Sequence, residues 1–497
     1  MPDHTLKLHN TNLTHLPPNV TIPTYNRGKL KTGIVHVGVG GFHRAHQAYY
    51  TNQLLENGNN EQWGICGVGL RPSDSHIQQA LLQQDYLYTL VTKHANGNVD
   101  ANIIGSIHGF LLAQDDPMAI INKMSEADTK MVTLTITEGG YNFVPATGEF
   151  NDQHPDVIHD LKFPQRPKLV FGYLVAALKI RKEQGIAPFT IVSCDNIQHN
   201  GDVMKKMLLS YAKLVDESLA EWIAAEVAFP NSMVDRITPA TTPEDHQALI
   251  QQANIVDNWP VICEPFHQWI IEDKFCNERP NWEDVGVKFV ADVTPYEKLK
   301  LRLLNAGHSI LAILGSLYGY HTMDECVNNP LFAKFFKQFA DNEATPILDP
   351  VPGIDVDEYK ATLLERFGNV AIKDTLARIR SESSAKFVSF LIPTLQENLA
   401  NNGEIKLLTF VLAAWCRFHH TMHDQLGKPL DIIDEMLNEL HETAKQTPQD
   451  PLAMLNITSI FGDLRFNKRF SDEYQSMITA LYDEPFVEKH MERLLAL

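Results

Sequence analysis

The sequence predicts an α/β fold in which a doubly wound parallel sheet forms the first half of the chain and a mainly α-helical domain forms the second. Three observations support this. Short β-branched runs alternate with helical stretches through the first half, a glycine-rich turn follows the first run, and beyond Glu297 almost only helical periodicity remains. The polar, turn-rich stretch 276–286 is the candidate hinge. We therefore expect one domain over residues 1–285 and a second over residues 286–497.

Composition and charge predict a folded protein without a nucleic-acid or membrane partner. Hydrophobic residues make up 44% of the 497 and charged residues 21%, which are ordinary globular values. The formal net charge of −19 repels polyphosphate and anionic membranes. The six cysteines form no CxxC pair, and neither a signal-peptide core nor an apolar run of membrane-spanning length is present. We expect a cytoplasmic protein, a monomer or a small homo-oligomer, that acts on a small molecule.

A glycine turn follows the first predicted strand. The run at residues 34–37 leads into Gly38, Gly40 and Gly41 and then into a helical pattern, which is the order of a Rossmann-like dinucleotide-binding unit. Glycines let the backbone approach a pyrophosphate, and the free N–H groups at the helix start favour its negative charge. His43 stands where the third glycine of GxGxxG is usually found. By itself, the motif is therefore a weak indication of a nicotinamide dinucleotide.

Two charged residues bear on the choice of cofactor. A second predicted strand at residues 63–70 is followed by Asp74, and an acidic residue in this place commonly binds the ribose 2′-hydroxyl of NAD. Asp74 lies 36 positions after Gly38, a longer gap than usual, so a helix N-cap is an equally good interpretation. Arg71 is suited to a 2′-phosphate instead. The sequence favours NAD and leaves NADP open.

His43, Arg44 and His46 follow the glycine turn directly. Arg44 can supply positive charge to a pyrophosphate. The two histidines have no carboxylate or cysteine partner at a metal-binding spacing, so we expect no metal site. The Cys, His and Glu pattern that zinc-type alcohol dehydrogenases need is not found in the sequence either.

Polar residues follow two further predicted strands. Glu138 comes after the run at residues 130–137, and Asp195 and Asn196 follow the run at residues 188–193. Ligands of open α/β sheets bind beyond the carboxyl ends of the strands. We therefore include Glu138 and Asn196 among the candidate site residues, although strand ends also carry Asp and Asn simply as turn formers.

The helical stretch at residues 297–320 carries the most informative cluster. On an α-helix at about 100° per residue, Lys300, His308 and Asn305 fall at roughly 0°, 80° and 140°, so one broad face can carry all three. An amine, an imidazole and an amide on one face suit a reacting oxygen, although a single histidine on an apolar helix is more often a hydrogen-bonded core residue. Spacing alone leaves Lys298 and Lys300 as alternative bases.

Six motifs, taken together and in order, resemble one known family. They are VGVGGFHRAHQAYY, LTITEGGY, SCDN, MVDRITP, CEPFHQW and KLRLLNAGHS. The chain resembles the polyol-specific long-chain dehydrogenases and reductases, the family of the mannitol dehydrogenases, over about residues 10–475. The resemblance implies a metal-independent, NAD-dependent oxidoreductase that interconverts D-mannitol and D-fructose at carbon 2 by hydride transfer.

The resemblance also implies a role for each candidate residue. Lys300 is implied as the general base, and Asn305 with Asn196 as the amides that hold the developing alkoxide. A free lysine has a pKa of about 10.4, so a lysine base needs a site that disfavours its charge, and we expect the cation Arg302 to contribute. The remaining implied roles are polyol orientation by His308, Asp235 and Arg378, a proton route through Glu297, and cofactor binding by Gly38, Gly40, Phe42 and His43, with Asp74 near the adenosine ribose.

Three alternatives stay open. A uronate reductase of the same family, acting on fructuronate or tagaturonate, would need an additional cation for the substrate carboxylate. Arabinitol or sorbitol as the preferred polyol is a smaller change. A catalytically silent dinucleotide-binding sensor is the most distant alternative, and it is disfavoured because such proteins usually lose residues of the kind of Lys300, Asn305 and Asn196, which are all present here.

Overall fold

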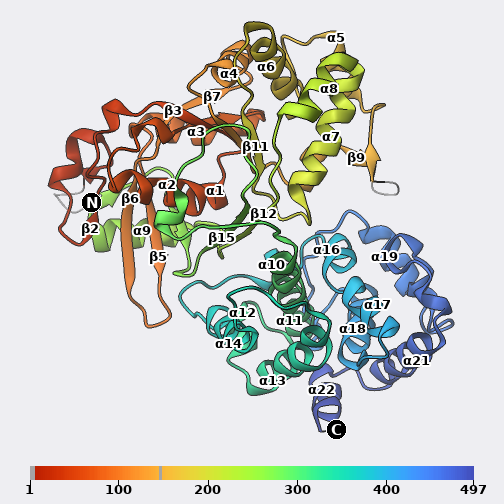
Figure 1. Cartoon of the computed structure of the whole chain (residues 1–497). Coiled ribbons are helices and arrows are strands. Elements are labelled where there is room, and N and C mark those ends of the chain that lie inside the picture. The colour runs from red at the N-terminus through yellow and green to blue at the C-terminus, as the bar shows by residue number, and fades with distance from the viewer. Residues whose placement is uncertain (1–5, 145–147, 497) are drawn as a thin grey trace. The chain divides into compact units, whose positions relative to one another are not determined.

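The computed structural model describes residues 6–144 and 148–496 and divides the chain into two compact units, Met1–Val293 and Thr294–Leu497 (Figure 1). The division lies downstream of the turn-rich stretch 276–286. Within the described ranges, no helix has both the length and the apolar character needed to cross a membrane.

The first unit is built on a five-stranded sheet in which every pairing is parallel. Its strand order is β11-β8-β3-β4-β7, so the chain moves outward from β3 to β7 and then returns to the other side of β3. The order reverses between β3 and β8, which is where open α/β sheets bind ligands. This confirms the predicted doubly wound fold. The strands are β3 (Thr32–Val37), β4 (Gly64–Gly69), β7 (Ile107–Leu112), β8 (Met131–Leu134) and β11 (Thr190–Ser193).

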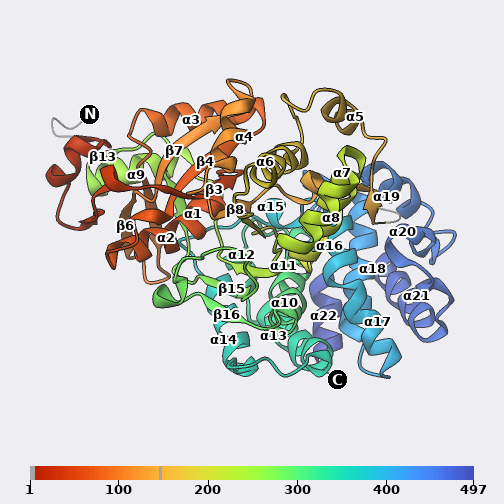
Figure 2. The same cartoon turned by 45° about the horizontal axis from the view of Figure 1, so that its top comes forward.

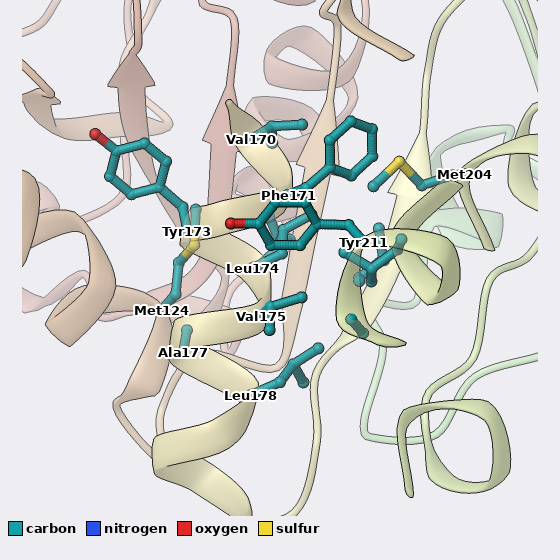
Figure 3. Close-up of a cluster of buried hydrophobic side chains, with 14 of the residues drawn as sticks. Met124, Val170, Phe171, Tyr173, Leu174, Val175, Ala177, Leu178, Met204 and Tyr211 are labelled. Atoms are coloured by element: carbon teal, nitrogen blue, oxygen red, sulfur yellow. The ribbon is translucent and has the colours of Figure 1, made fainter. Parts of the chain in front are cut away.

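Helices cover both faces of this sheet (Figures 1 and 2). Because strand side chains alternate, Val35 and Val37 enter one buried cluster with α4, α6 and α7, whereas Ile34 enters another with α2 and α3. Figure 3 shows the first cluster, in which α6 side chains such as Leu174 lie beside Tyr211 of α7. The helices are α1 (Gly41–Ala45), α2 (Gln47–Glu56), α3 (Ser75–Leu82), α4 (Pro117–Ser125), α5 (Pro155–Lys162), α6 (Val170–Gln184), α7 (Asn200–Val215), α8 (Glu217–Glu226) and α9 (Pro243–Ala253).

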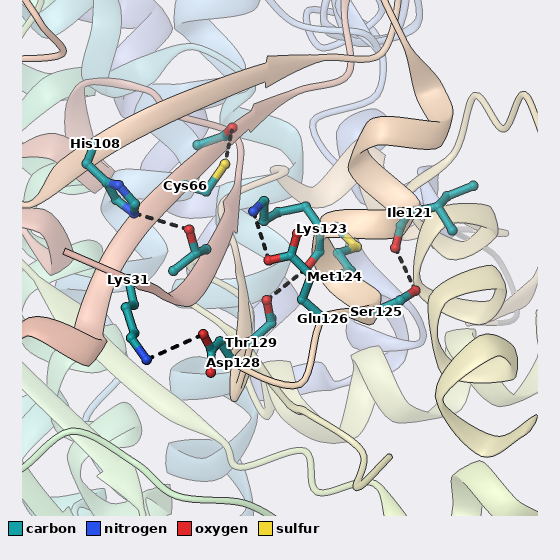
Figure 4. Close-up of polar contacts among 12 residues, drawn as sticks. Lys31, Cys66, His108, Ile121, Lys123, Met124, Ser125, Glu126, Asp128 and Thr129 are labelled. Carbon is teal, nitrogen blue, oxygen red and sulfur yellow. Dashed lines mark hydrogen bonds and ion pairs between the residues drawn. The ribbon is translucent and has the colours of Figure 1, made fainter. Parts of the chain in front are cut away.

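Polar contacts hold the amino ends of the central strands (Figure 4). Lys31, just before β3, forms an ion pair with Asp128 (3.9 Å), and the Thr32 hydroxyl lies 3.1 Å from Nε2 of His108 at the start of β7. The Thr129 hydroxyl, just before β8, donates to a carbonyl at the end of α4. The candidate residues of this unit belong to the opposite, carboxyl edge of the sheet.

The described part of the first unit also has a four-stranded sheet, a three-stranded sheet and two short strand pairs, none of which was predicted. The four-stranded sheet has the order β14-β5-β6-β2 and contains the hairpin β5–β6, whose turn includes Asn96 and Gly97, with Gly97 at φ +86°. The three-stranded sheet has the order β12-β15-β16 and carries Asp235 at the end of β12. The strands are β2 (Val20–Thr21), β5 (Tyr88–Lys93), β6 (Val99–Ile104), β12 (Ser232–Asp235), β14 (Val261–Cys263), β15 (Gln268–Glu272) and β16 (Lys288–Val290), with the short pairs β1 (Leu6–Lys7) and β13 (Ile255–Val256), and β9 (Phe143–Val144) and β10 (Glu149–Phe150).

The second unit is mainly helical, as predicted. Its long helices α11 and α18 are buried on almost every side, which explains their near-continuous apolar sequences. The helices are α10 (Thr294–Leu299), α11 (Ala306–Tyr318), α12 (Met323–Val327), α13 (Pro330–Phe339), α14 (Val356–Phe367), α15 (Leu376–Arg380), α16 (Ser383–Phe390), α17 (Ile392–Ala400), α18 (Lys406–Thr421), α19 (Leu437–Ala444), α20 (Thr458–Phe461), α21 (Lys468–Asp483) and α22 (Val487–Leu495).

Candidate active site

The glycine turn after β3 has a shape that requires glycine. Gly38 adopts φ +95°, and a Cβ there would lie 2.0 Å from the Thr135 carbonyl oxygen. His36 secures the turn from inside the sheet, with Nε2 3.2 Å from the Gly38 carbonyl oxygen and 3.0 Å from the Thr135 hydroxyl. At Gly40, which precedes α1, the nearest atom to an added Cβ is 4.0 Å away. Gly40 therefore leaves open space of the kind a pyrophosphate needs.

The residues after Gly41 turn mostly into the protein. His43 is buried and stacks on His36 at 3.4 Å, and burial lowers its pKa well below the usual range, so the ring is neutral. Arg44 donates to the Trp259 carbonyl oxygen (2.5 Å) and lies over the ring of Tyr88. Phe42 is only partly buried. The structure thus gives Arg44 a packing contact, and a direct contact between Arg44 and a phosphate stays a prediction.

Asp74 lies on the 3₁₀ turn that follows β4. Its carboxylate accepts the backbone N–H of Arg71 (3.0 Å) and forms an ion pair with the Arg71 guanidinium (3.3 Å). It makes no side-chain cap bond to α3, which begins at the next residue. A Cβ on Gly69, the last residue of β4, would lie 2.6 Å from the Cβ of Asp74, so glycine lets the acidic residue fold back over the strand end.

The other candidates of the first unit follow the carboxyl ends of strands. Glu138 and Asn196 are exposed and follow β8 and β11, and Asp235 is the buried last residue of β12. Between the first two lies the buried carboxyl of Asp195, which accepts the backbone N–H of Thr137 at 2.8 Å. The structure therefore places Glu138 and Asn196 on two loops that one buried side chain connects.

In the second unit, all candidates except Arg378 lie on one continuous helical segment formed by α10, a π-helical stretch (Lys300–Asn305) and α11. A π turn bonds residue i to i+5 instead of i+4, so Lys300 and Asn305 come closer to one face than an ideal α-helix predicts. Over residues 301–317, all of which are described, every residue is buried except Asn305 and His308. These two side chains mark the one partly exposed face of this stretch of helix, which we call the open face.

Lys298 and Lys300 have different surroundings. Lys298 forms ion pairs with Glu397 (2.8 Å) and Asp349 (3.6 Å), whereas Lys300 is 7% exposed. Arg302 also pairs with Glu397 (3.4 Å). Glu397 is thus shared by two cations, Lys298 and Arg302, and the contribution of Arg302 to disfavouring the charge on Lys300 stays a prediction.

Two polar atoms on the open face lack a partner among the described residues. They are Oδ1 of Asn305 and Nε2 of His308. The His308 ring stacks on Phe367 at 4.2 Å, and its enclosed position lowers its pKa well below the usual range, with Arg378 adding to the effect. Because buried polar atoms are normally hydrogen-bonded, one unpartnered atom on each of these two side chains indicates a place for a polar ligand.

The last two candidates of this unit are Glu297, near the start of that helical segment, and Arg378 on α15. Glu297 on α10 is 4% exposed, which suits a buried proton route. Arg378 on α15 forms a two-point ion pair with Asp374, and this pairing raises the pKa of Arg378. Its charge is thus fixed in place by a carboxylate of the same unit.

Sequence reasoning missed three buried side chains that shape the site of the first unit: His36, Tyr141 and Asn200. A histidine within the apolar run 34–37 was a usable signal, because a buried histidine needs partners. The described ranges contain no group of three or more His, Cys, Asp or Glu side chains placed to hold a metal ion.

Comparison with known proteins gives a consistent result for both units. Residues 32–284 match the model of the mannitol dehydrogenase Rossmann domain, and residues 292–482 match that of the mannitol dehydrogenase C-terminal domain. The chain is 47% identical to a mannitol 2-dehydrogenase of Aspergillus fumigatus and 44% identical to that of Aspergillus terreus, over 96% of this chain in both cases and over 96% and 97% of the two relatives.

Two solved structures have the same architecture. The Pseudomonas fluorescens mannitol 2-dehydrogenase in a ternary complex with NAD and D-mannitol superposes with a TM-score of 0.91 at 43% identity, covering 99% of this chain and all of that one. A substrate-free D-sorbitol dehydrogenase superposes with a TM-score of 0.87 at 34% identity, covering 97% and 99% of the two chains. These matches confirm the resemblance seen in the six motifs, and the chain belongs to the mannitol dehydrogenase family.

Proposed function

We propose that this chain is a metal-independent, NAD-dependent mannitol 2-dehydrogenase that interconverts D-mannitol and D-fructose. The observation that carries the proposal is the open helix face of the second unit, where Asn305 and His308 present unpartnered polar atoms a short way along the helix from the buried amine of Lys300. An amine base with amide and imidazole groups suits the oxidation of an alcohol. The relatives named mannitol 2-dehydrogenase support mannitol as the substrate.

The chemistry needs one proton transfer and one hydride transfer. In the oxidising direction, the neutral Lys300 amine takes the proton of the C2 hydroxyl, and the electron pair of the C2–H bond leaves as hydride while the C2 carbonyl forms. Bound NAD supplies the hydride acceptor. Burial favours the neutral form of an amine, which a general base must have. Glu297, buried near the start of the same helix, then passes the proton onward.

The amides and charged groups stabilise and orient the substrate. The side-chain N–H₂ groups of Asn305 and Asn196 donate to the oxygen that becomes an alkoxide, and each such donor typically contributes about 3–4 kcal/mol. The Oδ1 of Asn305, unpartnered among the described residues, is an acceptor, which suits a hydroxyl of the polyol. His308, held neutral, exchanges hydrogen bonds with polyol hydroxyls. Asp235 accepts from and Arg378 donates to the other hydroxyls.

The first unit fits a dinucleotide. The turn of Gly38 and Gly40 with Gly41, Phe42 and His43 would bind the pyrophosphate at the point where the strand order reverses, and Glu138 would line the same edge. Asp74 would accept hydrogen bonds from the adenosine ribose. Because Arg71 is already paired with Asp74, a 2′-phosphate would have to compete with that carboxylate, which favours NAD over NADP.

The test is a panel of substrates and cofactors. NADH or NADPH formation is measured at pH 9 to 10 with mannitol, sorbitol, arabinitol, mannonate and altronate, each with NAD and with NADP. The proposal predicts the highest specificity constant for mannitol with NAD. Sorbitol is the second candidate because of the similarity to a D-sorbitol dehydrogenase. A preference for mannonate or altronate would instead identify a uronate reductase, and no activity with any polyol would favour a silent sensor.

The location and assembly of the protein also belong to the proposal. The acidic charge and unpaired cysteine pattern support a cytoplasmic enzyme. Sedimentation of the purified protein would decide between a monomer and a small homo-oligomer.

A further inference from the structure

Asp195 connects the two loops that carry Asn196 and Glu138. It is the residue directly before Asn196, and its side chain is buried. Its carboxylate accepts the backbone N–H of Ile136 (3.1 Å), the backbone N–H of Thr137 (2.8 Å) and the hydroxyl of Tyr141 (2.8 Å). All three donors lie in the segment that follows β8. One side chain at the end of β11 therefore holds the whole neighbouring loop.

The loop after β8 needs this support. Thr137 has φ +60° and ψ 170°, a combination that β-branched residues almost never adopt. Such a conformation persists only where the surroundings fix it. The hydrogen bond from the Thr137 N–H to Asp195 is a direct constraint on this residue, and Glu138 is the next residue along the chain. The direction in which Glu138 leaves the sheet thus depends on Asp195.

Asn200 extends the connection to a third segment. Its side-chain amide donates to the Asp195 carbonyl oxygen (3.0 Å) and to the Ser232 carbonyl oxygen (2.9 Å), and it accepts the Ser232 backbone N–H (2.9 Å). Ser232 begins strand β12, and that strand ends at Asp235. The backbone of Asp195 is therefore held in register with the strand that carries the third candidate residue of this unit.

We propose that Asp195 is a positioning residue that fixes Asn196 and Glu138 relative to each other, with Tyr141 as its side-chain partner. This inference rests on the proposed function. Asp195 touches neither substrate nor cofactor in this account; it acts through the backbone of its neighbours. The three donors aimed at its carboxylate show that the site is built for an acceptor-only group. An asparagine there would turn an N–H₂ group toward one of these donors, so the loop would have to move.

The test compares two buried tyrosines, one with a hydrogen-bonded hydroxyl and one without. Tyr141→Phe removes a hydroxyl that donates to Asp195 and also lies 2.5 Å from the Ser193 hydroxyl. Tyr173→Phe removes a hydroxyl that has no partner among the described residues, from a side chain of the same unit that is equally buried. Asp195→Asn is the stronger variant. For each protein, kcat with D-mannitol is divided by the number of NADH-binding sites, and the isotope effect is measured with D-mannitol deuterated at C2 and at the equivalent C5.

We expect kcat per site to fall about 3- to 10-fold in Tyr141→Phe and about 100-fold in Asp195→Asn, because small displacements of reacting groups lower the rate steeply. In Tyr173→Phe, kcat per site should equal that of the wild type. The isotope effect should rise in the first two variants, since hydride transfer becomes slower than product release. A purely structural role would lower the number of sites and leave both kcat per site and the isotope effect unchanged.

The failure of this inference differs from the failure of the proposed function. An active wild type, together with a Tyr141→Phe variant whose kcat per site equals that of Tyr173→Phe, would overturn the inference alone. That comparison decides the matter even if Asp195→Asn does not fold. A wild type that forms no NADH with any polyol would overturn the proposed function and the inference with it.

Discussion

The candidate residues of the two units are held in place by different means. In the first unit, Glu138 and Asn196 lie on short loops beyond strand ends, and buried side chains such as Asp195 fix those loops through backbone hydrogen bonds. In the second unit, Lys300 and Asn305 lie on one helical segment whose neighbours are almost all buried, so packing fixes them. Activity should therefore be sensitive, in the first unit, to the loss of single polar atoms. In the second unit, it should be sensitive to changes in side-chain volume or in the reacting group itself.

The largest effect is expected for the reacting amine. Lys300→Ala should lower turnover by about 10²- to 10⁴-fold, because a general base contributes that much, while NADH binding changes little. Lys298→Ala is the matched control: its amine is already paired with Glu397 and Asp349, so we expect less than about a threefold change. Turnover and NADH affinity are measured for both. Equal losses in the two variants would mean that the helix, not the Lys300 amine, determines the rate.

A buried carboxyl in the second unit offers a contrast with Asp195. Glu343 accepts the backbone N–H groups of Leu407 (2.6 Å) and Leu408 (2.9 Å) at the start of α18, and burial raises its pKa to about 7. Because this pKa lies above its unfolded value, Glu343 contributes stability that is fully present below about pH 4.5 and is lost as the pH rises through 7, by about 3 kcal/mol at most.

Replacing Glu343 should remove this pH dependence without affecting catalysis. In Glu343→Gln, the decline in unfolding free energy between pH 5 and pH 8 should become shallower than in the wild type, while kcat per NADH-binding site stays the same, since none of the candidate residues adjoins Leu407 or Leu408 in sequence. Denaturant unfolding at several pH values provides the slopes. An unchanged slope would show that Glu343 titrates as it does in the unfolded chain.

The packing of α11 predicts a smaller effect on stability. A Cβ on Gly307 would lie 2.3 Å from Cε2 of Phe336, a buried ring of α13. Gly307→Ala should therefore destabilise the protein by about 1–2 kcal/mol, because overpacking exceeds the gain in helix propensity. Gly109→Ala is the control, since its Cβ would make an ordinary 3.7 Å contact with Cys66 Sγ and should change stability by less than about 0.5 kcal/mol. If Gly307→Ala is as stable as the wild type, α13 with its Phe336 ring can shift to make room for the added methyl group.

The smallest effect on stability is expected at the surface of the first unit. The Arg71 side chain is 78% exposed, so Arg71→Ala should alter the free energy of unfolding by less than about 0.5 kcal/mol. It should nevertheless raise the preference for NAD over NADP, because it removes the cation best suited to a 2′-phosphate. Specificity constants with the two cofactors test this. A higher relative activity with NADP would assign the opposite role to Arg71.

The sequence predicted four of the five strands of the central sheet, because each is a short apolar run that ends in a turn, but it did not predict the edge strand β7 (Ile107–Leu112). It did not predict the hairpin β5–β6, although Asn96 and Gly97 are a typical hairpin signal. The π-helical stretch (Lys300–Asn305) was also missed, since the choice between i+4 and i+5 bonding depends on how a helix packs, which residue periodicity does not encode.

The sequence predicted which residues belong to the candidate site, but it did not predict the contacts that hold them in place. The six motifs named Asn196 and Glu138, whereas the role of Asp195 in connecting them depends on hydrogen bonds between residues 54 to 59 positions apart. Likewise, spacing left Lys298 and Lys300 as alternatives, and only the resemblance favoured Lys300. The ion pair between Lys298 and Glu397, a residue on another helix, could not be seen in the sequence. Contacts of this kind follow from the fold and have no local sequence pattern.

The most direct test of the proposed function follows the hydrogen at carbon 2. D-Mannitol deuterated at C2 and at the symmetry-equivalent C5 is incubated with the enzyme and NAD, and the sugar and the nicotinamide products are analysed by mass spectrometry. The account predicts D-fructose as the product and one deuterium in the nicotinamide ring of NADH. D-Mannose together with unlabelled NADH would contradict it, because the hydride would then have come from carbon 1.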